Sequence, residues 1–286
     1  MSSKSSTDPG VWKHQATQWD RVGPPLHPSP SDLEHHEDVI RRVSAECAAR
    51  GAALRALALG VTPEHASMKW PPGSTLLALD KSAEMIERVW PGHPRPGEGA
   101  RLADWLNPPT DLGPYDIVVS DGPFGVLRHP EEHATLLAVV RRWLSPHGRF
   151  TFRVFVRPDD QETPEDVFEA ALDGSPGLES FHAFKLRLLM AVQTNVLDGV
   201  HTRRVWDVWH DQGPDPAALA RSRGWPLEQI STIDAYRGSD SIYCFPTTIE
   251  LRKLICAARL EEETFSVPDY PLGERCPRFV LKRSLD

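Results

Sequence analysis

Short apolar runs alternate with helical patterns through the first half of the chain. Five runs read as buried strands, over residues 53–59, 75–79, 100–104, 115–120 and 149–156. The segments between them carry helical patterns, best developed over residues 82–90 and 130–144. Strands that are apolar throughout and alternate with helices are typical of a parallel sheet covered on both faces. The sequence therefore predicts an α/β fold with a mostly parallel sheet.

A helix is expected before the first strand. Residues 31–34 read Ser-Asp-Leu-Glu after Pro30, a spacing that fits a capping box with Ser31 as the cap and Glu34 as its partner. The helix should run to about Arg50, where Gly51 provides the stop.

The pattern changes after Pro158. Residues 163–235 show helical periodicity and no convincing strand, whereas strand character returns over residues 241–245, 263–267 and 279–282. We expect a helical insertion, with the sheet completed at the C-terminus. We expect one structural domain overall. Residues 1–50 are predicted to form a tail, an arm and a helix, and residues 51–158 an α/β core. Residues 159–240 are predicted to form a helical lid, and residues 241–286 the last strands.

Composition narrows the classes of partner. The chain has 286 residues and a formal net charge of −8, and no long run of basic residues interrupts it. Binding to phosphate backbones or anionic membranes needs clustered Lys and Arg, so neither partner is expected. No apolar stretch approaches the roughly 20 residues of a membrane span. The four cysteines lack metal-site spacing, which favours reduced thiols in the cytoplasm.

The ends of the first two strands carry the most informative residues. Gly60 follows the first strand and Asp80 ends the second. An acid at the end of the second strand of a βαβ unit binds the hydroxyls of a nucleoside ribose. The sequence thus predicts an adenosine-containing cofactor. Nicotinamide enzymes place three spaced glycines at the first turn, and this turn has one.

Residues 50–158 resemble the class I S-adenosylmethionine-dependent methyltransferases. The family has a Gly-rich turn after strand 1, an acid ending strand 2, an acid after strand 3 and an apolar-acidic patch at strand 4. This chain offers Gly60, Asp80, Asp104 and residues 120–124 in that order. Residues 80–85, Asp-Lys-Ser-Ala-Glu-Met, are similar to the family's Asp-x-Ser-x-x-Met and are the most specific match.

The resemblance implies a Rossmann-like seven-stranded sheet with helices on both faces, an N-terminal helical arm and a helical insertion. It implies S-adenosyl-L-methionine as the cofactor. Gly60 would contact the methionine part, Asp80 the ribose, and Asp104 with Trp105 the adenine. The other residues expected at the cofactor are Trp19, Thr62, Glu64, Lys81, Met85, Ser120 and Asp121.

The first turn departs from the family pattern. The family prefers an acid two residues before the first glycine, where it balances the ammonium group of the cofactor. Ala58 occupies that position here. Glu64, in the first turn of the next helix, is predicted to replace it.

Residues 121–124, Asp-Gly-Pro-Phe, admit two interpretations. They are similar to the Asp/Asn-Pro-Pro-Tyr/Phe motif of amino-methylating enzymes, except that Gly122 replaces the first proline. The alternative is an ordinary strand-4 loop over the methionine part of the cofactor, and the departure at Gly122 favours it.

The sequence contains no motif that identifies the catalytic residues. Methyl transfer requires removal of a proton where the nucleophile carries one, and the weak candidates for that role are His182, His201, His210 and Tyr236. Trp206 and Trp209 are three residues apart and share a helix face. They could form a wall for a flat substrate or pack in the core. The adjacent His35 and His36 are expected to be solvated rather than metal-binding.

The function predicted is methyl transfer to an O or N nucleophile of a small molecule, with no metal. Trp12 and Trp19 in the N-terminal arm are expected to fold over the cofactor cleft. The alternatives are a protein or nucleic-acid methyltransferase, and a non-catalytic S-adenosylmethionine-binding protein. The sequence leaves the oligomeric state, the substrate and the use of a general base open.

Overall fold

The computed structural model describes residues 19–92 and 97–284. Its seven-stranded sheet has the order β3-β2-β1-β4-β5-β9-β8. Only β9 runs antiparallel to its neighbours β5 and β8. The predicted α/β fold with a mostly parallel sheet is confirmed. The strands are β1 (Arg55–Leu59), β2 (Thr75–Asp80), β3 (Glu98–Leu102), β4 (Tyr115–Asp121), β5 (Leu144–Arg153), β8 (Leu260–Ser266) and β9 (Arg278–Arg283).

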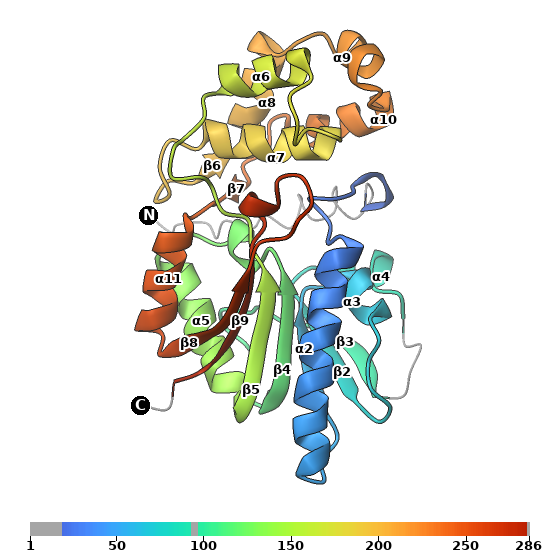
Figure 1. Cartoon of the computed structure of the whole chain (residues 1–286), viewed down its shortest axis with the longest axis vertical. Helices are drawn as coiled ribbons and strands as arrows, with labels where there is room; N and C mark the ends of the chain where they lie inside the picture. Colours follow the sequence, from blue (N-terminus) through green and yellow to red (C-terminus); the bar gives the residue numbers. More distant parts are fainter. Residues whose placement is uncertain (1–18, 93–96, 285–286) are drawn as a thin grey trace.

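Helices cover both faces of the sheet (Figure 1). Helix α2 (Pro30–Ala49), α3 (Pro63–Ser67) and α4 (Ala83–Arg88) pack on one face against small strand residues such as Ala58. Helix α5 (Glu131–Trp143) and α11 (Thr248–Ala257) pack on the other face. Side chains alternate across a strand, so β1, β2, β4 and β9 supply residues to both cores. None of the described helices is long and apolar enough to cross a membrane.

The segment between β5 and β8 builds a helical cap with a core of its own (Figure 1). All the residues of α7 are buried, which makes this helix the centre of the cap. A two-stranded antiparallel sheet pairs β6, just before α8, with β7, just after η3. The cap elements are α6 (Pro164–Asp173), α7 (Phe181–Val192), β6 (Val200–His201), α8 (Thr202–Gln212), α9 (Pro216–Arg223), α10 (Leu227–Ile230), η3 (Ser231–Tyr236) and β7 (Ile242–Tyr243).

The predicted capping box of α2 is shifted by two residues. Ser29 is the cap, and its hydroxyl accepts a hydrogen bond from the Asp32 amide at 3.3 Å. The Asp32 carboxylate in turn accepts from the Ser29 amide at 2.9 Å. Pro30 therefore occupies the first helical position, where its fixed φ suits the helix and its missing N–H costs nothing. The prediction of Ser31 and Glu34 was wrong for this reason.

Two strand predictions also need correction. Residues 145–148 precede the strand predicted over residues 149–156, yet they belong to β5, because a register shift opposite Tyr115 and Ile117 accommodates them. Residues 241–245 do not extend the main sheet. Residues 242 and 243 form β7, which pairs with β6 inside the cap. The sequence did not predict β6, because a strand of two residues has no recognisable hydrophobic pattern.

Candidate functional site

One cavity lies between the carboxyl ends of the strands and the cap. The cavity encloses about 190 Å³ and opens to solvent at its mouth. The strand order reverses between β1 and β4, and the cavity opens at this point, the usual ligand site of open α/β sheets. The strand ends and following loops contribute Leu59, Gly60, Val61, Thr62, Asp80, Lys81, Met85, Asp104, Trp105, Asp121, Gly122, Gly125, Val126, Leu127 and Phe155.

The turn after β1 brings backbone close to the cavity. Gly60 has a φ of +93°, a conformation that other residues rarely adopt, and its amide donates to the Leu79 carbonyl at 2.8 Å. Thr62 precedes α3 and lines the cavity, and its side chain makes no capping hydrogen bond to the helix.

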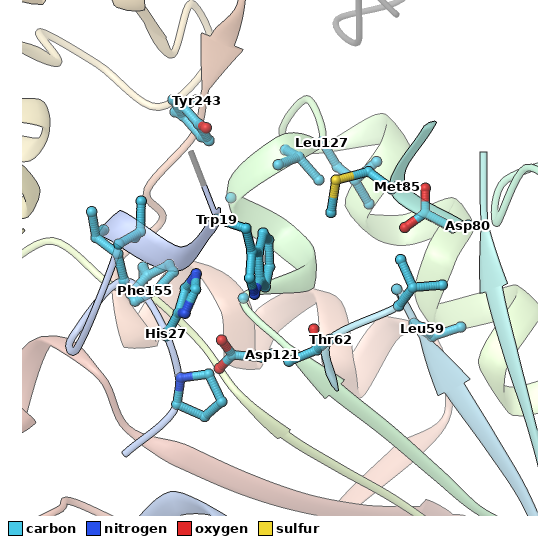
Figure 2. A pocket seen from close by; sticks show the side chains of 18 of the residues that line it. Trp19, His27, Leu59, Thr62, Asp80, Met85, Asp121, Leu127, Phe155 and Tyr243 are labelled. Atoms are coloured by element: carbon cyan, nitrogen blue, oxygen red, sulfur yellow. The ribbon is translucent and has the colours of Figure 1, made fainter. Parts of the chain in front are cut away.

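The end of β2 places a partly buried carboxylate, Asp80, in the cavity wall. An Asp80 oxygen accepts from the Ser82 amide at 2.8 Å, and the Ser82 hydroxyl caps α4 through the Met85 amide at 3.2 Å. Burial raises the pKa of Asp80. Hydroxyl donors from a ligand would therefore stabilise its charged form. Figure 2 shows the Asp80 and Met85 side chains together on one side of the pocket.

The loop after β3 closes the same end. The Trp105 indole donates to the Leu79 carbonyl at 2.8 Å, which fixes the ring beside the ends of β1 and β2. Asp104 is exposed at the rim, where its carboxylate accepts from the Leu106 amide at 2.9 Å.

The end of β4 carries a bidentate ion pair. Asp121 accepts from the Arg153 guanidinium at 2.6 and 2.9 Å, and the Arg153 side chain is 0% exposed. A second carboxylate, Asp32 of α2, lies 3.6 Å from Arg153 and accepts from the Tyr270 hydroxyl. This network fixes Asp121 in the cavity lining.

Gly122 allows a close contact after β4. Its φ is +59°, and a Cβ at this position would meet the Phe155 ring at 2.8 Å. Phe155 lines the cavity, whereas Phe124 is fully buried in the core against Phe152 and His133. The aromatic of the Asp-Gly-Pro-Phe segment thus packs in the core, which favours the interpretation as an ordinary strand-4 loop.

The N-terminal segment forms another wall. Trp19 and His27 line the cavity, with ring centroids 4.2 Å apart, and Figure 2 shows both labelled among the lining side chains. The segment contributes Trp19, Val22, Leu26, His27 and Pro28. The prediction for Trp12 falls outside the described residues.

Glu64 does not line the cavity. Its carboxylate lies 3.4 Å from the His27 ring. Burial acts to raise the pKa of Glu64, but the hydrogen bond with His27, a backbone hydrogen bond and the charges of His27 and His65 together outweigh it, and the pKa is lowered. The structure therefore gives Glu64 a partner within the protein.

Ser120 also lies outside the lining. It is fully buried and donates to the Leu59 carbonyl at 3.2 Å, so it ties β4 to β1 beneath the cavity floor.

The cap supplies the opposite wall: Lys185, Leu186, Leu189, Thr232, Ala235, Tyr236, Tyr243 and Phe245. Tyr236 was expected in this region and lines the cavity. Lys185 and Thr232 were not identified from the sequence. The available signal was a single lysine within an apolar helix, Phe181–Val192.

The three histidine candidates lie elsewhere. His182 is buried in α7 outside the lining, and burial lowers its pKa to about 4. His201 lines a separate shallow hollow beside β7. His210 is exposed and stacks on Trp206 at 4.7 Å. Trp209 packs in the core of the cap and does not line the cavity, so of its two expected roles the core role fits.

His36 is not solvated, and that expectation was wrong. It is fully buried under α2, and its ring lies 2.9 Å from the Thr151 hydroxyl of β5. The sequence does not show which face of α2 packs against the sheet, and it is this face that carries His36 and buries it. Within residues 19–92 and 97–284, no group of three or more His, Cys, Asp or Glu lies together as metal ligands would.

Comparison with known proteins shows the fold. No sequence family and no curated protein matches the chain in sequence. Among solved structures, a candidate zinc-dependent alcohol dehydrogenase from Rhodobacter sphaeroides is 14% identical, with a TM-score of 0.59 and 99% of each chain covered. The CcbJ methyltransferase from Streptomyces caelestis is also 14% identical, with a TM-score of 0.57, 97% of this chain covered and 100% of the other. The chain shares this seven-stranded Rossmann-like architecture.

Proposed function

We propose that the chain is a class I S-adenosylmethionine-dependent methyltransferase that acts on a small molecule. One observation carries this proposal: Gly60, Asp80 and Asp104 with Trp105 follow three adjacent parallel strands and line one cavity in that order. Their order across the sheet is the order of the methionine, ribose and adenine parts of the cofactor.

The residues present fit this cofactor. Asp80 would accept hydrogen bonds from the two ribose hydroxyls, which would offset the cost of its burial. Trp105 and Met85 offer flat and apolar surface beside it. The cofactor supplies a sulfonium methyl group when bound, and the protein aligns the acceptor behind that methyl and excludes water.

The ammonium group needs an anionic partner. We propose Asp121 for this role in place of Glu64. Asp121 lines the cavity next to the Gly60 turn, whereas the Glu64 carboxylate is paired with His27. The Asp121 oxygens each accept one bond from Arg153 and retain capacity for another.

The substrate is proposed to be small because the cap and the N-terminal segment enclose the end of the cavity beyond the strand ends. The net charge of −8 argues against a nucleic acid. We place the protein in the cytoplasm on the strength of its cysteines, all four of which are free.

Calorimetric titration tests the proposal. S-adenosylmethionine and its demethylated product should bind, and reduced nicotinamide dinucleotide should not, because the single glycine at the first turn leaves little room for a pyrophosphate. Binding of the dinucleotide alone would favour a dehydrogenase instead. A methyl-release assay over small aromatic acceptors then separates an enzyme from a protein that only binds the cofactor.

A further inference from the structure

Lys185 is a buried amine in the cap wall of the cavity. It lies in the middle of α7, is 4% exposed, and reaches the cavity from the side opposite the strand ends. The cofactor positions proposed above do not use it. Removing a lysine side chain from water is costly, so this residue requires an explanation.

The hydrogen bonds of Lys185 define what its nitrogen can do. Nζ donates to the Thr232 hydroxyl at 3.0 Å, and that hydroxyl donates its own proton to the Gln229 carbonyl at 2.7 Å. Thr232 can therefore only accept from Lys185. A neutral amine that gives one N–H to Thr232 keeps its lone pair available to the cavity.

No carboxylate of the described residues forms an ion pair with Lys185. Three acids line the same cavity at the strand ends, and Glu162 of the segment leading to α6 is engaged by Arg187 and Arg275. The ionisable neighbours on the cap side are Tyr236, whose ring centroid lies 5.5 Å from Nζ, and His182 on the same helix. His27 and Tyr243 line the cavity from the other elements.

Among the described residues, a positive charge on Lys185 has the face of the Tyr236 ring and the Thr232 hydroxyl beside it, and no carboxylate pairs with it. Burial lowers the pKa of Lys185 to about 7. A substantial fraction of the amine is neutral near pH 7, as general bases require.

We propose that Lys185 is the general base that takes the proton from the substrate's nucleophile, with Thr232 as a positioning residue. The proposal rests on the proposed methyltransferase function. The Nζ lone pair accepts the proton of the acceptor O–H, and the oxygen forms a bond to the methyl carbon. The carbon–sulfur bond breaks and its electron pair stays on the sulfur. Lys185 is left protonated and later returns the proton to water.

The same geometry selects a substrate class. Phe155, Tyr243 and Phe245 line the cavity with Tyr236, and such rings favour a flat aromatic molecule. A phenolic hydroxyl is neutral before it loses its proton. An ammonium acceptor would instead place a cation beside Lys185 on the cap side, where no carboxylate of the described residues lines the cavity. The inferred substrate is a small phenol.

The first test measures the ionisation of Lys185 directly. The chain has few lysines, so a protein labelled with carbon-13 at lysine Cε gives separable NMR signals, and the signal missing from Lys185→Met identifies Lys185. We expect it to titrate near pH 7 in the complex with the demethylated product. Titration near 10 would overturn the proposal. The lysines are Lys4, Lys13, Lys69, Lys81, Lys185, Lys253 and Lys282.

The second test uses methyl transfer to a panel of simple phenols. For the wild type, kcat should rise with pH through about 7 and then level off, because the neutral amine is the active form. Lys185→Met should lower kcat by about 100-fold and abolish this dependence. Lys253→Met, at an exposed lysine, is the matched control and should change neither.

Other variants separate a base from an anion-binding cation. Lys185→Arg keeps the charge but cannot accept a proton, so full activity in this variant would overturn the proposal. Cofactor affinity of Lys185→Met should stay within about twofold. Failure of the wild type to bind S-adenosylmethionine would instead refute the proposed function. Cofactor binding without turnover of any phenol would refute the substrate class.

Discussion

The two walls of the cavity are built in different ways. At the strand ends, Asp80 and Asp121 are held by hydrogen bonds from the protein, and each is the last residue of its strand. On the cap side, α7 is distant along the chain from η3 and β7, and Thr232 is the one hydrogen-bond partner of Lys185 among the described residues. The strand-end wall is organised before any ligand arrives. The cap wall leaves a reactive group free for one, which is the division expected between a cofactor site and a substrate site.

The largest expected effect is on the network beneath the strand ends. Arg153→Met would leave Asp121 and Asp32 without their buried cation, at a cost of about 3–5 kcal/mol in the free energy of unfolding. Chemical denaturation measures this. Arg252→Met removes an exposed pair with Glu262 and should cost about 0–1 kcal/mol. Similar losses in both variants would mean that the network does not stabilise the cavity floor.

Asp80→Ala should act on binding rather than on stability. It removes charge-assisted hydrogen bonds to the ribose, worth about 2–4 kcal/mol in the affinity for S-adenosylmethionine. Calorimetric titration gives the affinity, with Asp207→Ala on the exposed surface of α8 as the control. An affinity within twofold of the wild type would remove Asp80 from the site.

Gly122→Ala and Gly224→Ala test a glycine at the strand ends against a glycine in the cap. Both Gly122 and Gly224 have positive φ, but only Gly122 has a ring against its missing Cβ. We expect losses of about 2–3 kcal/mol for Gly122→Ala and about 1 kcal/mol for Gly224→Ala. Equal losses of stability in the two variants, measured by thermal or chemical unfolding, would show that the Phe155 ring moves aside at no energetic cost.

The smallest effect tests the acid predicted to replace Ala58. Because Glu64 pairs with His27, Glu64→Gln should cost about 0.3–1 kcal/mol of stability and leave cofactor affinity unchanged. The lowered pKa of Glu64 means that this stabilisation is present above about pH 4.5 and is lost as the pH falls.

Asp121→Asn is the matched comparison and should weaken cofactor binding. If Glu64→Gln weakened it instead, Glu64 would be the ammonium partner that the sequence predicted. Titrations on the two variants decide between them, and melting curves follow stability in parallel.

The sequence by itself determined the sheet and the strand-end wall. Gly60, Asp80, Asp104 and Trp105 could be found because parallel strands present their carboxyl ends at one edge, so a residue just after a strand has a known place. Local patterns of burial were sufficient for these strands, whereas the cap of α2 was predicted two residues too late.

Only the tertiary structure decided the rest. The cap wall joins Lys185 to Thr232 across 47 positions of the chain, and no local pattern carries that contact. The same holds for Glu64 beside His27 and for the burial of His36 against Thr151. In each case a polar side chain takes its role from a partner on a distant element. Only the packing of whole elements brings such partners together.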